Sequence, residues 1–167
     1  MINILASLDR GIVIALECQS EEVCLMYEYS RPVYYYETDK MGVVHHSNYI
    51  RWLEEARTCF FDDADLSYFE TERYGVLSPV TDISIKYMHP AQFGDTFTVR
   101  LRLIKYTGVR FRVSYGVINQ NGVTLIEGES GHAFIDLNHK PVSFSRLIPE
   151  RHKKMNELLE SHKNMPE

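Results

Sequence analysis

The sequence has little cysteine and no excess of positive charge, and both shortages reduce the number of functional classes to which it can belong. Its 167 residues include three cysteines, Cys18, Cys24 and Cys59. Their spacing matches no metal-binding motif, and an odd number does not suit a disulfide framework. We therefore expect a reducing, cytoplasmic compartment and no bound metal. The net charge of −5 argues against a general nucleic-acid-binding surface but is compatible with a local basic patch.

A long apolar run is also missing, even near the N-terminus. Residues 1–16 are fairly apolar, but Asp9 and Arg10 interrupt them, and the run 11–16 is too short to span a membrane. A signal peptide would place basic residues before its apolar stretch, and this segment does not. We expect residues 1–26 to be an N-terminal extension, an extra strand or a segment packed on the domain, with Met26 as an alternative start.

The rest of the chain has no repeat or low-complexity tract, and its length fits one domain. Residues 32–36 are β-branched and aromatic, which predicts a strand that ends before Gly42. A helix is then predicted from Ser47, its expected N-cap, to the acidic stretch 62–65. Its apolar face repeats at helical spacing and comprises Tyr49, Trp52, Leu53, Ala56 and Phe60.

After this helix, apolar and polar residues alternate over 83–87, 97–103 and 109–117, which predicts long strands with one apolar face. Asn121 and Gly122 predict a hairpin before a last strand, 123–136, in which Gly128 and Gly131 mark a bulge or a close approach. A C-terminal helix is predicted over 150–162. One apolar helix must pack on the apolar face of the sheet, so we predict an α+β hotdog fold, a curved antiparallel sheet around one long helix. The predicted boundaries are 1–26 for the extension, 27–148 for this domain, and 149–167 for the C-terminal helix and tail.

The segment before the long helix carries the candidate chemistry. It places Asp39 in a loop with Gly42, just ahead of a helix N-terminus. The first N–H groups of a helix are unpaired and partly positive, so they can polarise a carbonyl and stabilise the oxyanion formed on attack. A carboxylate facing that carbonyl can act as a nucleophile or as a general base for water. The segment thus offers both parts needed for acyl transfer, although an acidic loop residue can also be a simple cap.

The same segment resembles the signature of the 4-hydroxybenzoyl-CoA thioesterase-like hotdog enzymes. It is most similar to the bacterial subgroup associated with the Tol-Pal gene cluster. The likeness runs from about Tyr29 to Phe144 and includes the stretches 83–90 and 93–95. The residues that carry the motif are Tyr35, Asp39, Gly42, Val44, His45, His46, Asn48 and Tyr49, followed by Glu54 and Arg57 in the helix.

This resemblance implies an acyl-CoA thioesterase that hydrolyses acyl-CoA to a free carboxylic acid and CoA, without a cofactor. By position, Asp39 matches the catalytic aspartate, and His46 supplies the backbone N–H that polarises the carbonyl. Tyr35 matches an assisting tyrosine, and the side chain of His46 also helps. Arg110 and Arg112 point to one sheet face and are candidates for binding the phosphates of CoA, because arginine presents forked donors. An open sheet edge predicts a homodimer or homotetramer, and acyl carrier protein is an alternative carrier.

Several alternatives stay open at this point. Asp39 can be a turn residue, His46 can act through its backbone alone, and Tyr35 can be a core aromatic. Glu54 or Glu55 is an alternative catalytic acid, although an ion pair of Glu54 with Arg57 is the simpler expectation. The arginines can form an ordinary solvated face. As a whole, the protein can be a non-catalytic acyl-thioester binder or scaffold, or a hotdog hydratase or dehydratase. The acyl group is not predicted.

Overall fold

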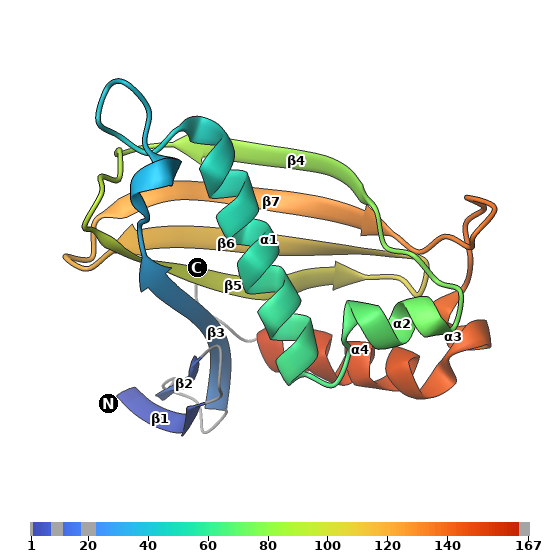
Figure 1. Ribbon diagram of the computed structural model, residues 1–167. Helices are drawn as coiled ribbons and strands as arrows, with labels where there is room; N and C mark the ends of the chain where they lie inside the picture. Colours follow the sequence, from blue (N-terminus) through green and yellow to red (C-terminus); the bar gives the residue numbers. More distant parts are fainter. Residues whose placement is uncertain (1, 8–11, 18–22, 164–167) are drawn as a thin grey trace.

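The structure, a computed structural model, describes residues 2–7, 12–17 and 23–163. One long helix crosses one face of a seven-stranded antiparallel sheet (Figure 1). The strands lie in the order β1-β2-β3-β5-β6-β7-β4. Their bounds are β1 Ile2–Ser7, β2 Ile12–Glu17, β3 Val23–Pro32, β4 Val80–Tyr87, β5 Thr96–Tyr106, β6 Arg110–Asn119 and β7 Thr124–Ala133. The predicted arrangement of sheet and helix is confirmed.

The central helix, α1 (His46–Asp63), packs its apolar face on the sheet. Trp52 is fully buried there, and its ring stacks on Phe97 of β5 with centroids 3.8 Å apart. The predicted N-cap at Ser47 is wrong, because the cap is His45, whose Nδ1 accepts a hydrogen bond from the Ser47 N–H. The Ser47 hydroxyl is itself 2.9 Å from this Nδ1 atom, so the imidazole is the group that meets the first turn.

The strand predicted over 32–36 is also wrong. Strand β3 ends at Pro32, and a 3-10 turn, η1 (Tyr35–Glu37), follows it. The Glu37 carboxylate folds back to accept a hydrogen bond from the Tyr34 N–H at 2.7 Å, which closes the turn. The strand propensity of three consecutive tyrosines therefore yields to one local hydrogen bond made by the residue behind them.

Three shorter helices complete the described chain, namely α2 (Tyr68–Arg73), α3 (Phe144–Leu147) and α4 (Pro149–Lys163). Helix α4 agrees with the predicted C-terminal helix and lies against β5 and β3. Its Met155 is buried, and Leu158 and Leu159 pack partly buried against the core, as predicted. Among the described residues, no helix is both long and apolar enough to cross a membrane.

The two glycines of β7 lie where its neighbour β4 comes close. A Cβ atom on Gly128 would meet the backbone oxygen of Ser84, and one on Gly131 would collide with the Asp82 carboxylate. The β4–β7 register also shifts between Val80 and Asp82. The predicted close approach is confirmed, and it lets β4 pair with β7 from Ile126 to His132.

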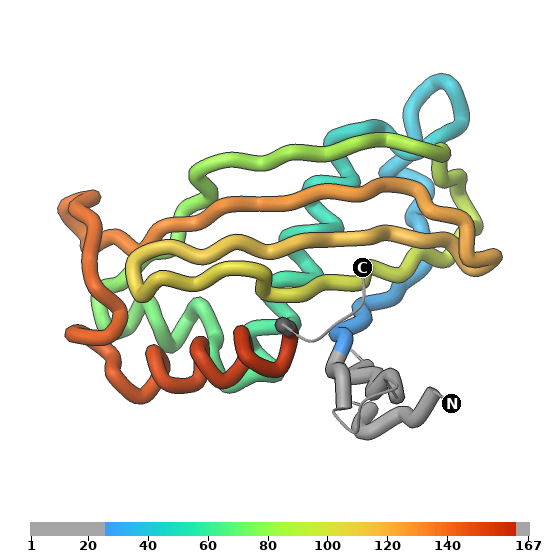
Figure 2. The backbone as a smooth tube through the Cα atoms, turned by 180° about the vertical axis from the view of Figure 1, so that it is seen from behind, coloured from blue at the N-terminus to red at the C-terminus, as the bar shows by residue number. Residues whose placement is uncertain are grey.

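The two edges of the sheet differ. Beyond β3, strands β1 and β2 continue the sheet, so the N-terminal segment contains two strands, where an extra strand or a segment packed on the domain was expected. Strand β3 begins at Val23 and thus runs across the predicted boundary at residue 26. At the other edge, β4 pairs with β7 and with no other described strand, and Ile83 and Tyr87 of its apolar row remain 40% and 48% exposed. Figure 2 shows the sheet face opposite α1, which no described helix covers.

Candidate active site

Asp39 lies in a tight loop between η1 and α1 that is closed by its own backbone. The Asp39 N–H donates to the Val43 carbonyl at 2.9 Å, and the Gly42 N–H donates to the Asp39 carbonyl at 2.9 Å. Gly42 has a φ of +78°, a left-handed conformation that favours glycine. The Met41 N–H donates to Asp39 Oδ1 at 2.7 Å. Within the described chain nothing donates to Oδ2, so the half-buried carboxylate keeps one oxygen available.

His46 opens α1 at the same end of the molecule as this loop (Figure 1). Its side chain is exposed. Its backbone N–H belongs to the first turn of the helix, where the positive end of the helix dipole lies, and it finds no acceptor among the described residues. Its carbonyl accepts a hydrogen bond from Tyr87 Oη at 3.1 Å, which ties the helix start to β4. The N–H that the sequence singles out is thus available to a ligand.

The loop and the helix start are held together by the neighbouring β4–β5 connection. Thr38 and Val44 form an isolated β-bridge across the base of the loop. The Val44 N–H then donates to the Ala91 carbonyl at 2.8 Å, and the Ala91 N–H donates to the Tyr49 hydroxyl of α1 at 2.9 Å. The Asp39 loop is therefore anchored at both ends, as a preorganised carboxylate requires.

Tyr35 is placed differently from the other two predicted catalytic residues. Its side chain is 76% exposed and packs edge-on against Phe93, with ring centroids 5.5 Å apart. Within the described part of the chain, no hydrogen bond joins its hydroxyl to Asp39 or His46. Tyr35 is thus not a core aromatic, and its assisting role stays a prediction.

Arg110 and Arg112 lie on the sheet face away from α1. The residues that alternate with them along β6, Phe111 and Val113, are buried on the face that α1 covers. Arg112 pairs with Asp82 at 2.7 Å and with Glu129 at 3.4 Å. The hydrogen bond from Arg112 lowers the pKa of the Asp82 carboxyl group. The start of β6 lies at the opposite end of the sheet from the loop at 39–42 (Figure 1). Within one chain, the structure does not bring these arginines to Asp39.

The expected ion pair of Glu54 with Arg57 is wrong. Arg57 is only 7% exposed, and its guanidinium donates to the hydroxyl groups of Tyr68 at 2.9 Å and Tyr115 at 3.3 Å. Tyr115 is 58 residues away in the sequence, so this contact could not be predicted from the helical spacing of Glu54 and Arg57. The contacts continue from Tyr115 to Ser130, 2.8 Å away, and from Ser130 to His132 Nε2, 2.7 Å away.

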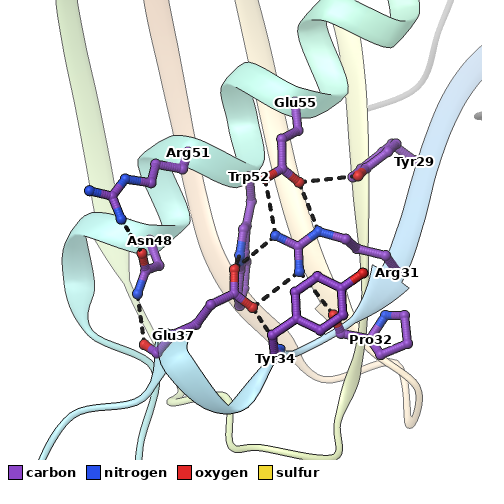
Figure 3. A network of polar contacts seen from close by, with 9 residues as sticks. All are labelled: Tyr29, Arg31, Pro32, Tyr34, Glu37, Asn48, Arg51, Trp52 and Glu55. Carbon is purple, nitrogen blue, oxygen red and sulfur yellow. Dashed lines mark hydrogen bonds and ion pairs between the residues drawn. The ribbon is translucent and has the colours of Figure 1, made fainter.

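A second polar network was not foreseen from the sequence, and it borders the Asp39 loop (Figure 3). The guanidinium of Arg31, at the end of β3, lies between two carboxylates. It contacts Glu37 of η1 at 2.8 and 3.1 Å and Glu55 of α1 at 2.8 and 3.1 Å. Tyr29 donates to Glu55 at 3.1 Å. Glu55, the alternative catalytic acid, is therefore engaged in an ion pair, while Glu54 is exposed.

Glu37 is the most enclosed charged residue of this network. It is only 3% exposed, and Trp52 Nε1 donates to its carboxylate at 2.7 Å. Burial by itself raises the pKa of the Glu37 carboxyl group, but the hydrogen bonds from Arg31, Trp52 and the Tyr34 backbone outweigh burial and lower this pKa below its ordinary value. The sequence signal for this network was an acidic residue, Glu37, two positions before Asp39. Its role could be recognised only once the structure showed its distant partners.

The rings of His45 and His46 lie side by side at the helix start, tilted by 39° with centroids 4.2 Å apart. Imidazole pairs can bind metals, but a protein site usually needs at least one further ligand. Across the described ranges, no group of three or more His, Cys, Asp or Glu side chains is arranged to hold a metal ion.

Comparisons with known proteins give a consistent result. A family model described as "Thioesterase-like superfamily" matches residues 33–157. The putative acyl-CoA thioesterase YneP of Bacillus subtilis (strain 168) is 38% identical over 121 residues, 72% of this chain and 88% of the relative. The acyl-CoA thioester hydrolase YbgC of Escherichia coli is 26% identical over 70% of this chain and 87% of its own. The solved DHNA-CoA thioesterase of Staphylococcus aureus is 28% identical, with a TM-score of 0.79 over 84% of this chain and 97% of that chain.

Proposed function

The chain belongs to the Thioesterase-like superfamily, and from this premise we propose that Asp39 and the start of α1 form its active site. The protein is a thioester hydrolase, since relatives that match most of the chain are named as acyl-CoA thioesterases and hydrolases. The roles of individual residues are our proposal. The observation that carries it is that a hydrogen-bonded carboxylate, Asp39, lies in the loop leading directly into a helix N-terminus, where the His46 N–H has no acceptor among the described residues.

The proposed reaction converts an acyl-CoA and water into a carboxylic acid and the free thiol of CoA. The His46 N–H binds the thioester carbonyl oxygen and stabilises the negative charge that forms on it. In one route, Asp39 removes a proton from water as the water oxygen attacks the carbonyl carbon. The C–S bond then breaks, and the thiolate takes up the proton.

In the other route, Asp39 itself attacks the carbonyl carbon, and the thiolate leaves from the tetrahedral adduct to give a mixed anhydride, which water then hydrolyses. Both routes need the same carboxylate and the same N–H, and neither needs a cofactor. The side chain of His46 and the hydroxyl of Tyr35 are proposed to assist, with Tyr35 turning from Phe93 when substrate binds.

The alternative reactions find less support in this geometry. A hotdog hydratase or dehydratase would need a helix glutamate near the acyl chain, whereas Glu55 is paired with Arg31 and Tyr29. A scaffold would need no preorganised carboxylate. Measuring the free thiol released from a panel of acyl-CoAs separates the possibilities. A thioesterase releases thiol in proportion to enzyme, whereas a binder or hydratase releases none.

The finer assignment is also a proposal. The motif from Tyr35 to Tyr49 supports the 4-hydroxybenzoyl-CoA thioesterase-like type and its Tol-Pal-associated subgroup. We propose acyl-CoA as the substrate, with acyl carrier protein as the alternative carrier. We also propose the cytoplasm as the compartment, because an odd number of cysteines does not suit a disulfide framework. Arg110 remains exposed and could meet a CoA phosphate, while Arg112 would have to leave Asp82 or share its donors.

We propose that the active protein is a homodimer or homotetramer. Strand β4 is an open edge, and the apolar side chains Val80, Ile83 and Tyr87 on it are at least 40% exposed. An unpaired edge with exposed apolar residues favours pairing with a second strand. A second copy would also enclose the site, because His46 and Tyr87 are open to solvent in one chain.

A further inference from the structure

The Glu37 network joins the two halves of the proposed site. The backbone carbonyl of Glu37 accepts hydrogen bonds from the His45 N–H at 2.9 Å and from Asn48 Nδ2 at 2.7 Å. His45 directly precedes the N–H donor His46, and Glu37 lies two residues before Asp39. One residue therefore sets the path of the chain into the carboxylate loop and also holds the first turn of α1.

The side chain of Glu37 fixes this arrangement to the rest of the fold. Its Oε1 atom accepts from Arg31 Nη2 at 2.8 Å and from Trp52 Nε1 at 2.7 Å. Its Oε2 atom accepts from Arg31 Nη1 at 3.1 Å and from the Tyr34 N–H at 2.7 Å. The donors come from β3, from α1 and from the turn itself, so the carboxylate joins three elements at a buried point (Figure 3).

We infer that Glu37 is a positioning residue for thioester hydrolysis, which keeps the Asp39 carboxylate and the His46 N–H in one fixed relation. This inference rests on the proposed roles of Asp39 and His46. Reacting groups must be aligned closely, and a displacement of about 1 Å caused by a change outside the reacting groups can cost about 100-fold in rate. Such alignment is achieved when buried, fully hydrogen-bonded side chains hold the site from behind.

A substitution by glutamine tests this role, because every partner of the Glu37 carboxylate is a donor. In Glu37→Gln, an NH2 group replaces one oxygen and faces two donors, whichever way the amide turns. Either the Trp52 contact or the Tyr34 contact is then lost, together with one contact to Arg31. The turn and the helix start are no longer tied together through this side chain.

The chain offers a matched control in Glu55. Glu55 shares Arg31 with Glu37, accepting from its Nε at 2.8 Å and from its Nη2 at 3.1 Å. It lies in the middle of α1 and has no hydrogen bond to the loop at 38–44. The Glu55→Gln change removes one negative charge beside the same arginine without touching the loop. A purely structural effect should therefore appear in both variants, and a positioning effect only in Glu37→Gln.

The experiment measures kcat and KM for thiol release from one acyl-CoA, together with the melting temperature, for the full chain and its variants. We expect Glu37→Gln to lower kcat by about 10- to 100-fold with little change in KM, and Glu55→Gln to keep kcat within about twofold. Trp52→Phe, which retains a ring on Phe97 but removes the Nε1 donor, should lower kcat in the same direction, and it serves as the test should Glu37→Gln not fold.

Equal kcat values in Glu37→Gln and Glu55→Gln would overturn the inference, as would an unchanged kcat in Trp52→Phe if Glu37→Gln fails to fold. Asp39→Asn, measured in parallel, separates this failure from a failure of the proposed function. If Asp39→Asn is inactive while Glu37→Gln keeps its kcat, only the positioning role is wrong. If Asp39→Asn keeps its activity, the proposed site itself is wrong and the positioning role falls with it.

Discussion

His132 gives a prediction about stability and pH that can be worked out from the structure. It lies on β7 with 1% of its surface exposed, stacked on Phe111 with ring centroids 4.5 Å apart. Burial, and then the nearby charge of Arg57, lower the pKa of His132 to about 3. In the unfolded chain the same group has an ordinary pKa of about 6.5. Between these two values the unfolded state binds more protons than the folded state.

The sign follows from this difference. The contribution of His132 to the free energy of unfolding is fully present above its pKa in the unfolded chain. It falls as the pH drops toward its pKa in the folded protein, by at most about 1.4 kcal/mol per pH unit. Between pH 7 and pH 4.5 the loss due to His132 is at most about 2.5 kcal/mol. The carboxyl groups with lowered pKa values, such as Glu37, lose their stabilising charge only below their ordinary range, so they contribute little in this window.

The assay is urea unfolding of the wild type and of His132→Gln at pH 7, 6, 5 and 4.5. Glutamine cannot titrate, and its amide can still meet Ser130, which lies 2.7 Å from His132 Nε2. We expect the variant to be less stable at pH 7 but to have a flatter dependence on pH. Parallel curves for the two proteins over this range would refute the reasoning, since they would show that His132 is not held neutral by the fold.

Three further predictions concern the surface and the termini. A chain that begins at Met26 should keep its turnover per site, because the motif and Asp39 follow it; an active wild type beside a folded but inactive shortened chain would show that β1 and β2 contribute to the site. Replacing Arg110 and Arg112 together by alanine should raise KM for acyl-CoA and weaken its dependence on salt while kcat stays largely intact, and an unmoved KM would assign them to the solvated face. Ile83→Lys, which adds a charge to the exposed row of β4, should shift the protein toward monomer in light scattering and reduce activity; a fully active monomer would refute the role of this edge.

The predictable part of the fold is the part governed by local periodicity. The alternation in β5 and β6 and the apolar face of α1 each repeat within a short window, so their burial follows from the sequence. The Asp39 loop was found through residue types at fixed spacing ahead of a helix. In both cases the deciding information lies within a few residues.

Most of the parts that were missed depend on contacts between distant residues. Besides its local bond to the Tyr34 N–H, the Glu37 carboxylate accepts from Arg31 and Trp52, and the buried Arg57 donates to Tyr115, 58 residues away. The cap at His45 depends on an imidazole orientation that propensity does not encode. The exposed setting of Tyr35 follows from the same turn. At Glu37 and Arg57 a tertiary contact overrides a local preference, whereas at His45 a contact two residues along the chain does so.

The proposed role of Asp39 is tested most directly by the kcat of Asp39→Asn for thiol release from an acyl-CoA that the wild type hydrolyses. Asparagine keeps an oxygen for the Met41 N–H and removes the charge, so the loop should persist and the melting temperature should stay close to that of the wild type. We expect kcat to fall by at least about 100-fold, the usual contribution of a general base or more. A folded Asp39→Asn enzyme with a kcat near that of the wild type would contradict the proposed site.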